Sequence, residues 1–561
     1  MTRVTDIIGE EFRDWGEVDW DAITYKPFHA NVVFLSAPTG TGKTTFALQV
    51  FSKFIVDSKK DGRVLILVPR RILKEQMERS LIEIFAGEAD FEYYVKNIRI
   101  LTYQALERAI LEGENIGEFY TVICDETHYF VDDTLFNPQT QLSFDWICDF
   151  ISKPDGIVVF QSATLNEFRD MIVRKMELCP ISQPPSPVSS EKIDGVRRLK
   201  VSVTGGTYPS RYFNYEIERD IPPVQVKYLV SESERLEVLK SRCKESKALC
   251  FVSNKAQGEE LSVALTKGGV KTLFVTAENK ERAGAEAVSC LVRDSKFPSG
   301  VLIATSVLDV GVNIIDEKVS ILILDTCDKN TFLQMAGRIR LKAEQNLTIY
   351  IFRRDIRFFK NWRENIIPRL QFQVELSRIP EKYVSAHILQ NMAQKESYVD
   401  KNAFFFQNGQ VKLNKLTEFG LRDRYQNFND IICGLEKDSE YFIKKELAWL
   451  GLEDSFNIDN YASKDIREQR RMEIIAMIRE LCIPISDSGD TKEKIHEKLQ
   501  HMKPEIRNLD KDFIRSNESL SVEKFRKICK YEQLPFTIVQ KEVNHKQMYW
   551  LIETPTDNKG D

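Results

Sequence analysis

The strongest constraint on the fold is a series of short apolar runs that alternates with longer, helix-like segments. Strands that are apolar on both faces are typical of parallel sheets covered by helices. Helix-like segments such as 44–59 and 70–85 separate the runs, so the pattern predicts an α/β domain. The first set of runs is NVVFLSAP (31–38), RVLILVP (63–69), NIRILTY (97–103), FYTVICDE (119–126) and GIVVFQSAT (156–164).

The same rhythm returns after a Pro/Ser-rich break at 179–195. The second set is VQVKYLV (224–230), ALCFVSN (248–254), KTLFVTA (271–277), GVLIATS (300–306), VSILILD (319–325) and LTIYIF (347–352). We therefore predict two tandem α/β domains with parallel sheets, followed by a mainly helical region. The predicted boundaries are 1–180 for the first domain, 181–224 for a linker, 225–355 for the second domain, 356–480 for a helical accessory region and 481–561 for a small, winged-helix-like module.

Composition excludes several classes of protein. The chain has 561 residues, of which 42% are hydrophobic and 29% charged, and no apolar run approaches the ~18–20 residues of a membrane span. The acidic N-terminus lacks the apolar core of a signal peptide, so we expect a cytoplasmic protein without a membrane partner. Ten cysteines form no C-x-x-C pair, which disfavours a zinc ribbon or an iron–sulfur cluster. His496 and His501 alone have metal-ligand spacing, which here is more typical of a helix surface.

The stretch APTGTGKTT (37–45) follows a predicted strand and precedes a predicted helix. It fits a phosphate-binding loop, with Ala37 at the usual first-glycine position. Small residues let backbone N–H groups surround the phosphates, Lys43 neutralises their oxygens, and the Thr44 hydroxyl is a ligand for Mg²⁺. The predicted nucleotide-binding residues are Gly40, Thr41, Gly42, Lys43, Thr44 and Thr45.

The stretch VICDETHYF (122–130) places an acidic pair at the end of an apolar strand. In a domain with a phosphate-binding loop, Asp125 is placed to hold Mg²⁺, together with Thr44. Glu126 is the predicted base that orients the attacking water. The alternative, in which the two carboxylates only cap the next helix, is weaker in this context. We therefore predict that ATP and Mg²⁺ are the cofactors.

D-E-x-H is also the second motif of the DExH-type superfamily 2 helicases, and the chain resembles this family over about residues 30–355. PRRILKEQ (69–76) is similar to the family's P-T-R-E-L-x-x-Q motif, and LTYQAL (101–106) follows it. SAT (162–164), FVSN (251–254), ATSVLDVGVNI (304–314) and QMAGRIR (334–340) continue the series in order. The resemblance implies two RecA-like domains with ATP between them.

The resemblance also implies roles for individual residues. Arg338 and Arg340 would stabilise negative charge on the γ-phosphate, with Gln334 and His128 close to the reacting groups, and Gly311 would belong to the nucleotide site. Ser162 and Thr164 would link the γ-phosphate state to domain movement. The residues implied to contact the sugar–phosphate backbone, without reading its sequence, are Arg71, Thr102, Ser253 and Thr305.

One departure bears on the substrate. Many of these helicases place their second arginine seven positions after the glutamine, where this chain has Leu341 instead. The Q-x-x-G-R-x-R form, together with SATLN (162–166), is closer to the herpesvirus-type origin-binding helicases, which favours DNA over RNA. Upstream of the loop, Tyr25 or Phe28 could stack on a base, but no adenine-reading glutamine is evident. This argues against the DEAD-box subgroup of RNA helicases.

The function favoured by these motifs is an ATP- and Mg²⁺-dependent helicase or translocase that moves on a nucleic-acid strand. An ATP-gated clamp that binds nucleic acid or protein without unwinding needs the same motifs, and an RNA helicase stays open as an alternative. Residues 352–369 interleave basic and aromatic side chains. They favour a helix that packs Phe358, Phe359 and Trp362 on the second domain over a strand-binding surface. A partner protein could bind the C-terminal third.

Overall fold

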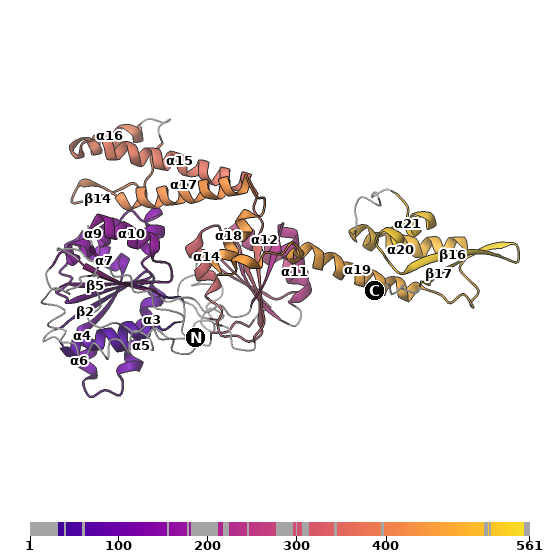
Figure 1. Ribbon diagram of the computed structural model, residues 1–561, viewed down its shortest axis with the longest axis horizontal. Coiled ribbons are helices and arrows are strands. Elements are labelled where there is room, and N and C mark those ends of the chain that lie inside the picture. Colours follow the sequence, from indigo (N-terminus) through magenta and orange to yellow (C-terminus); the bar gives the residue numbers. More distant parts are fainter. Residues whose placement is uncertain are drawn as a thin grey trace. The chain divides into compact units, whose positions relative to one another are not determined.

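The computed structural model describes residues 32–38, 41–58, 62–153, 156–176, 179–180, 211–216, 224–243, 246–276, 295–298, 300–305, 314–340, 345–393, 398–509, 514 and 518–554. They form two compact units (Figure 1). The larger comprises Met1–Val226 and Arg242–Phe456, and the smaller comprises Lys227–Ser241 and Asn457–Asp561.

The first sheet of the larger unit confirms the predicted parallel architecture. Its order is β3-β2-β4-β5-β1-β7-β6, and every neighbouring pair of strands in this order is parallel. The five predicted runs all form strands. The bounds are β1 (Val32–Ser36), β2 (Val64–Val68), β3 (Ile98–Thr102), β4 (Thr121–Asp125), β5 (Ile157–Ser162), β6 (Cys179–Pro180) and β7 (Arg211–Glu216). Strand β7 lies inside the predicted linker, which corrects that prediction: it pairs with β1 and places Tyr212 edge-on against Phe34.

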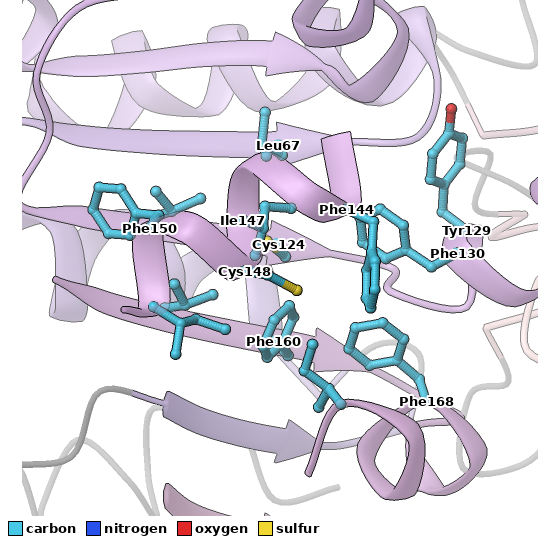
Figure 2. Close-up of a cluster of buried hydrophobic side chains, with 14 of the residues drawn as sticks. Leu67, Cys124, Tyr129, Phe130, Phe144, Ile147, Cys148, Phe150, Phe160 and Phe168 are labelled. Carbon is cyan, nitrogen blue, oxygen red and sulfur yellow. The ribbon is translucent and has the colours of Figure 1, made fainter. Parts of the chain in front are cut away.

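Alternate residues of the strands fill two cores, one on each face of this sheet. On one face, Ile66 and Ile123 pack with α4 (Lys53–Ser58) and α5 (Arg71–Phe85). On the other, Leu67 and Phe160 pack with α7 (Tyr103–Glu112), α9 (Thr140–Ile151) and α10 (Asn166–Lys175). Figure 2 shows the aromatic part of the second core, where Phe130, Phe144, Phe160 and Phe168 converge. Each buried ring contributes roughly 1.5–3 kcal/mol.

The second sheet has the order β10-β11-β9-β12-β13-β8. The pairs that join β10, β11, β9, β12 and β13 are parallel as well. All six runs predicted for this domain form strands. Helices α12 (Lys255–Lys267) and α14 (Lys329–Ala336) belong to this part of the chain. The strand bounds are β8 (Val224–Leu229), β9 (Lys247–Phe251), β10 (Thr272–Val275), β11 (Val301–Ala304), β12 (Val319–Leu324) and β13 (Leu347–Phe352).

The region after β13 is helical, as predicted, with one short hairpin. Its helices are α15 (Ile356–Arg378), α16 (Glu381–Ala393), α17 (Lys415–Leu435) and α18 (Tyr441–Trp449), and its hairpin is β14 (Phe404–Gln407) with β15 (Gln410–Leu413). Phe359 is fully buried, but its ring meets Phe428 of α17 and Phe442 of α18. Trp362 is 48% exposed. The predicted packing of this helix on the second domain is therefore corrected: its aromatic face packs mainly on the accessory helices.

The smaller unit contains α19 (Ala462–Leu481), α20 (Lys492–Leu509), α21 (Val522–Tyr531), β16 (Phe536–Val543) and β17 (Lys546–Glu553). The predicted helix followed by a hairpin is present, and Asn544 and His545 take positive φ in its two-residue turn. An apolar core joins the three helices to the hairpin. Among the described residues, no helix is both long and apolar enough to cross a membrane.

Candidate active site

The phosphate-binding loop leaves β1 and enters a helical stretch that starts with α3 (Lys43–Thr45). Gly42 has φ 92°, a left-handed conformation that favours glycine at this turn. Lys43 is 7% exposed, and its Nζ donates to the carbonyls of Ala37 at 2.7 Å and Pro38 at 3.1 Å. The lysine therefore points back into its own loop, where a phosphate would replace these carbonyls as its partner. Thr44 and Thr45 lie in the first turn, and Gly40 is outside the described residues.

The D-E-T-H segment follows β4 at the edge of the sheet where the loop also lies. Asp125 is 5% exposed and accepts a hydrogen bond from Gln161 Nε2 at 2.9 Å. Glu126 has φ 50°, a strained value for a residue with a side chain. Among described residues, no group of three or more His, Cys, Asp and Glu could hold a metal. A carboxylate and a hydroxyl, from Asp125 and Thr44, instead suit Mg²⁺ that takes its remaining ligands from phosphates and water.

The neighbouring strand β5 and the residues after it bring Ser162 and Thr164 next to the D-E-T-H segment. The parallel register pairs Asp125 with Gln161, so the residues that follow each strand lie together. Ser162 Oγ donates to Glu126 Oε2 at 3.3 Å and accepts from the backbone N–H of Thr164 at 3.2 Å. His128 Nδ1 is 3.4 Å from both Ser162 Oγ and Glu126 Oε2. These residues form one connected polar cluster, as the motif series predicts.

The pKa values of the two carboxyl groups are shifted in opposite directions. Burial and the neighbouring Glu126 raise the pKa of Asp125. Burial also opposes ionisation of Glu126, but its hydrogen bond with His128 and the charges of Lys43 and Arg338 lower its pKa. Burial lowers the pKa of Lys43, while the carboxylates of Glu126 and Asp125 oppose this shift. The arrangement favours the ionised form of Glu126, which is the form that its predicted role as a base requires.

Residues of the second domain complete this polar cluster. Gln334 on α14 is 3% exposed, and its Nε2 lies 2.8 Å from His128 Nε2. Arg338 is 6% exposed, and its charge acts on both Lys43 and Glu126; the charge of Arg340 also acts on Lys43. The backbone of this loop is bonded to Ile314 on both sides, from Ile314 N–H to Arg338 O and from Arg340 N–H to Ile314 O. The structure thus brings the sixth motif to the first and second, while Gly311 lies outside the described residues.

The four residues predicted to contact a strand lie next to the carboxyl ends of β2, β3, β9 and β11. The Arg71 side chain is 87% exposed and pairs with Glu75, and Ser253 is exposed and donates to Gln257. Thr102 caps α7 by accepting from the Ala105 N–H at 3.1 Å, and the Thr305 N–H reaches Val275 O at 3.4 Å. Among the described contacts none joins these four to one another, so their predicted role stays a prediction.

Sequence reasoning missed Gln161, which fixes the orientation of Asp125 from the next strand. Its position directly before Ser162 was the one available signal. It also missed Asp132, which the second-domain residue Asp328 and the accessory residue Arg424 both influence. Nothing local in the sequence marks Asp132, because its partners lie 196 and 292 positions away (328 − 132 and 424 − 132). Tyr25 and Phe28 are outside the described residues.

The sequence of this chain is similar to known proteins over part of its length. Residues 21–172 match the family model of the DEAD/DEAH box helicase. A protein of Methanocaldococcus jannaschii, named as an ATP-dependent RNA helicase, is 36% identical over 111 residues, which is 17% of this chain and 14% of that protein. This chain therefore aligns with only about a seventh of that relative's length.

A structure of a variant of S. cerevisiae Dbp5, bound to RNA and ADP-BeF3, overlaps 62% of this chain and 85% of its own. Its TM-score is 0.40 and its sequence identity is 17%, so the likeness is distant, and the fold rests on the two parallel sheets themselves. The similarity is confined to this domain and is consistent with the D-E-T-H cluster. Residues 21–172 of this chain are thus similar to the DEAD/DEAH box helicase family.

Proposed function

We propose that the chain is an ATP hydrolase that couples ATP turnover to movement on a nucleic-acid strand, as a helicase or translocase. The contact between Gln334 and His128 carries this proposal, because it joins the sixth motif of the second domain to the D-E-T-H motif of the first. The charges of Arg338 and Arg340 reach the lysine of the phosphate-binding loop across the same junction. A phosphate bound at Lys43 would therefore lie in the electrostatic field of groups from both domains.

In this proposal, each residue of the site has a separate role in ATP hydrolysis. Lys43 neutralises phosphate oxygens, and Glu126, held ionised, orients the attacking water and accepts its proton. Arg338 stabilises the negative charge that grows on the γ-phosphate oxygens. Thr44 and Asp125 would hold Mg²⁺, which supplies further positive charge to the phosphates. Loss of the γ-phosphate removes the anion that these cations face, so the attraction between the two domains falls after hydrolysis.

The polar cluster gives a route from the γ-phosphate to the strand. Ser162 contacts both Glu126 and His128, and His128 contacts Gln334 of the second domain. A change at Glu126 on hydrolysis can thus alter the contact between the domains. We propose that this change moves the second domain relative to Arg71 and Thr102, which would hold the sugar–phosphate backbone on the first.

Two observations disagree on whether the bound strand is DNA or RNA. The Q-x-x-G-R-x-R spacing favours DNA, whereas the relative that is 36% identical is named as an RNA helicase. The named relative has the greater weight because its match covers aligned residues of the chain rather than a single spacing, so RNA is the strand to test first. The ATP-gated clamp needs the same residues and differs only in the absence of strand displacement.

The test is ATP turnover by the full chain, measured alone and with single-stranded RNA, single-stranded DNA, duplexes of each and forked duplexes. We expect stimulation by at least one single strand. Displacement of a labelled strand from a forked duplex then separates the two mechanisms. Stimulated turnover without displacement at either fork polarity would support the clamp, and turnover that no nucleic acid changes would contradict the proposal.

A further inference from the structure

The segment that follows Glu126 forms a short, hydrogen-bonded helical turn directly after the reactive residues. The Tyr129 N–H donates to Glu126 O at 3.0 Å, and the Asp132 N–H donates to His128 O at 2.9 Å. Helix α8 (Tyr129–Asp132) then continues into a 3₁₀ turn over Asp133–Leu135. A strained residue such as Glu126 keeps its conformation only where its surroundings hold it. Whatever contacts residues 129–135 therefore helps to hold Glu126 and His128.

Helix α17 makes that contact at unusually short range. A Cβ atom on Gly420 would lie 2.8 Å from the carbonyl oxygen of Val131 and 3.4 Å from Leu135 Cδ2. Only the missing side chain lets the backbone of α17 approach the backbone of α8 this closely. Gly420 is buried and is the sixth residue of the 21-residue helix, an interior position where glycine is otherwise unfavourable. Close approach to α8 gives a physical reason for glycine at this position.

Buried hydrogen bonds fix α17 in this place. Thr417 Oγ1 donates to Thr134 O at 2.9 Å, and Thr134 Oγ1 donates to Asn414 Oδ1 at 3.1 Å. All three side chains are fully buried, so breaking one bond would leave polar atoms without water. At the rim, Arg424 lies 3.4 Å from Asp132 Oδ1. We call the contact of Asn414, Thr417, Gly420 and Arg424 with residues 131–135 the α17 dock.

The same accessory region also touches the other side of the reactive cluster. Helix α18 follows α17, and its Trp449 packs edge-on against Phe332 with ring centroids 5.3 Å apart. Phe332 lies on α14, the helix that carries Gln334. At the start of α18, Glu440 pairs with Arg353 at 3.0 Å. The accessory helices therefore contact both elements that meet in the His128–Gln334 pair.

We propose that α17 is a positioning element for hydrolysis, and that the α17 dock holds the D-E-T-H segment in register with Gln334. Gly420 and Thr417 are then positioning residues that never touch ATP. The proposal rests on the proposed function and adds a control on the same site. Through this dock the accessory region would set how strongly a bound strand stimulates ATP turnover. A site displaced by a fraction of an ångström loses turnover while its ground-state binding of ATP persists.

The sharpest test is Gly420→Ala in the full chain, because the added methyl meets a backbone oxygen that cannot turn away. Gly87→Ala is the matched control: it adds the same methyl where nothing lies within 4 Å. Each variant is compared with wild type in kcat and KM for ATP, alone and with a stimulating strand, and in its unfolding temperature. We expect Gly420→Ala to lower the stimulated kcat by roughly 10- to 100-fold with KM changed little, and Gly87→Ala to match wild type.

A second pair of variants protects the test against simple misfolding. Thr417→Val keeps the shape but removes the hydroxyl, whereas Thr417→Ser restores the hydroxyl that Thr134 O accepts from. We expect the serine variant to recover most of the stimulated kcat that the valine variant loses. Wild-type kcat in a folded Gly420→Ala, or equal activity of the two Thr417 variants, would overturn the dock. Absence of ATP turnover in wild type would instead overturn the proposed function, so the two failures are distinct.

Discussion

At the scale of the residue, Lys43 is the side chain on which the proposed chemistry depends first. It is buried and bonded to its own loop carbonyls, so it is preorganised for an anion at that place. We expect Lys43→Ala to lower ATP turnover by on the order of 10²-fold or more, because no other described cation lies within the loop. Steady-state ATPase assays measure the change, with the unfolding temperature as control. Unchanged turnover would contradict the whole site assignment.

Arg338 and Arg340 are separable by their kinetics. The charge of Arg338 affects the pKa values of both Lys43 and Glu126, and the charge of Arg340 affects that of Lys43. We expect Arg338→Ala to lower kcat by on the order of 10³-fold while ATP binding persists, because its charge is needed most in the transition state. Arg340→Ala should have a smaller effect on kcat. A rise in KM without loss of kcat in Arg338→Ala would assign this arginine to ground-state binding instead.

The raised pKa of Asp132 predicts how the stability of the folded protein depends on pH. Burial and the charge of Asp328 raise its pKa to about 7, although Arg424 opposes the shift. The folded protein therefore keeps this proton up to about pH 7, while the unfolded chain releases it near the ordinary value. The stability contributed by this proton is present at low pH and is lost as pH rises toward 7. We expect Asp132→Asn to unfold at a higher temperature than wild type near pH 8, by ~2–4 °C per kcal/mol, and to lose this advantage near pH 4, where Asp132 is protonated in the unfolded chain as well. An equal difference at both pH values would contradict this account.

Single residues were predictable where local pattern defines their role. Asp125 ends an apolar strand, Glu126 follows it, and Lys43 follows a glycine-rich turn, so all three could be placed from the sequence. Gln161 and Asp132 could not, because their roles come from neighbours in other strands and helices. The strain at Glu126 was also invisible, since a left-handed φ at a glutamate has no signature in the sequence.

At the scale of the element, the pattern of apolar residues predicted the strands and helices, but it did not predict which elements pack against each other. Helix α15 was predicted from its aromatic and basic residues, and its amphipathic character is confirmed by the buried Phe359 and the exposed Arg357. The partners of its apolar face lie 69 and 83 residues later, at Phe428 and Phe442 (428 − 359 and 442 − 359). Periodicity reports which face is buried and carries no information about what buries it.

Helix packing in the accessory region leads to a graded prediction. Phe359 is fully buried between α17 and α18, whereas Trp362, one turn later, is 48% exposed. We expect Phe359→Ala to destabilise the larger unit by about 3–5 kcal/mol, because it leaves a cavity among aromatic rings. Trp362→Ala should cost far less, since its ring is already half in water. Thermal and denaturant unfolding of both variants measure the difference, and equal losses would contradict the assigned core.

At the scale of the whole molecule, two parallel sheets in tandem could be predicted, but the division into compact units could not. The smaller unit takes Lys227–Ser241 from the middle of the chain and joins it to residues more than 200 positions later. Tyr228 is fully buried there, with its ring edge-on to Tyr461 and its hydroxyl accepting from the Asn457 N–H. Contacts at such separation depend on the assembled fold, so no local pattern in the segment 227–241 indicates them.

This division predicts that the C-terminal residues support a segment in the middle of the chain. Removal of 457–561 would expose Tyr228 and leave Lys227 without Asp465 and Glu237 without Arg470. We expect the shortened chain to unfold at a lower temperature and to expose residues 227–241 to hydrogen exchange. Tyr461→Ala should reproduce part of the loss, because it removes the ring packed on Tyr228 while the rest of the unit remains. If 227–241 stayed as protected in both variants as in the intact chain, these residues would belong to the second α/β domain alone, and α11 (Glu232–Arg242) would not depend on the C-terminal unit.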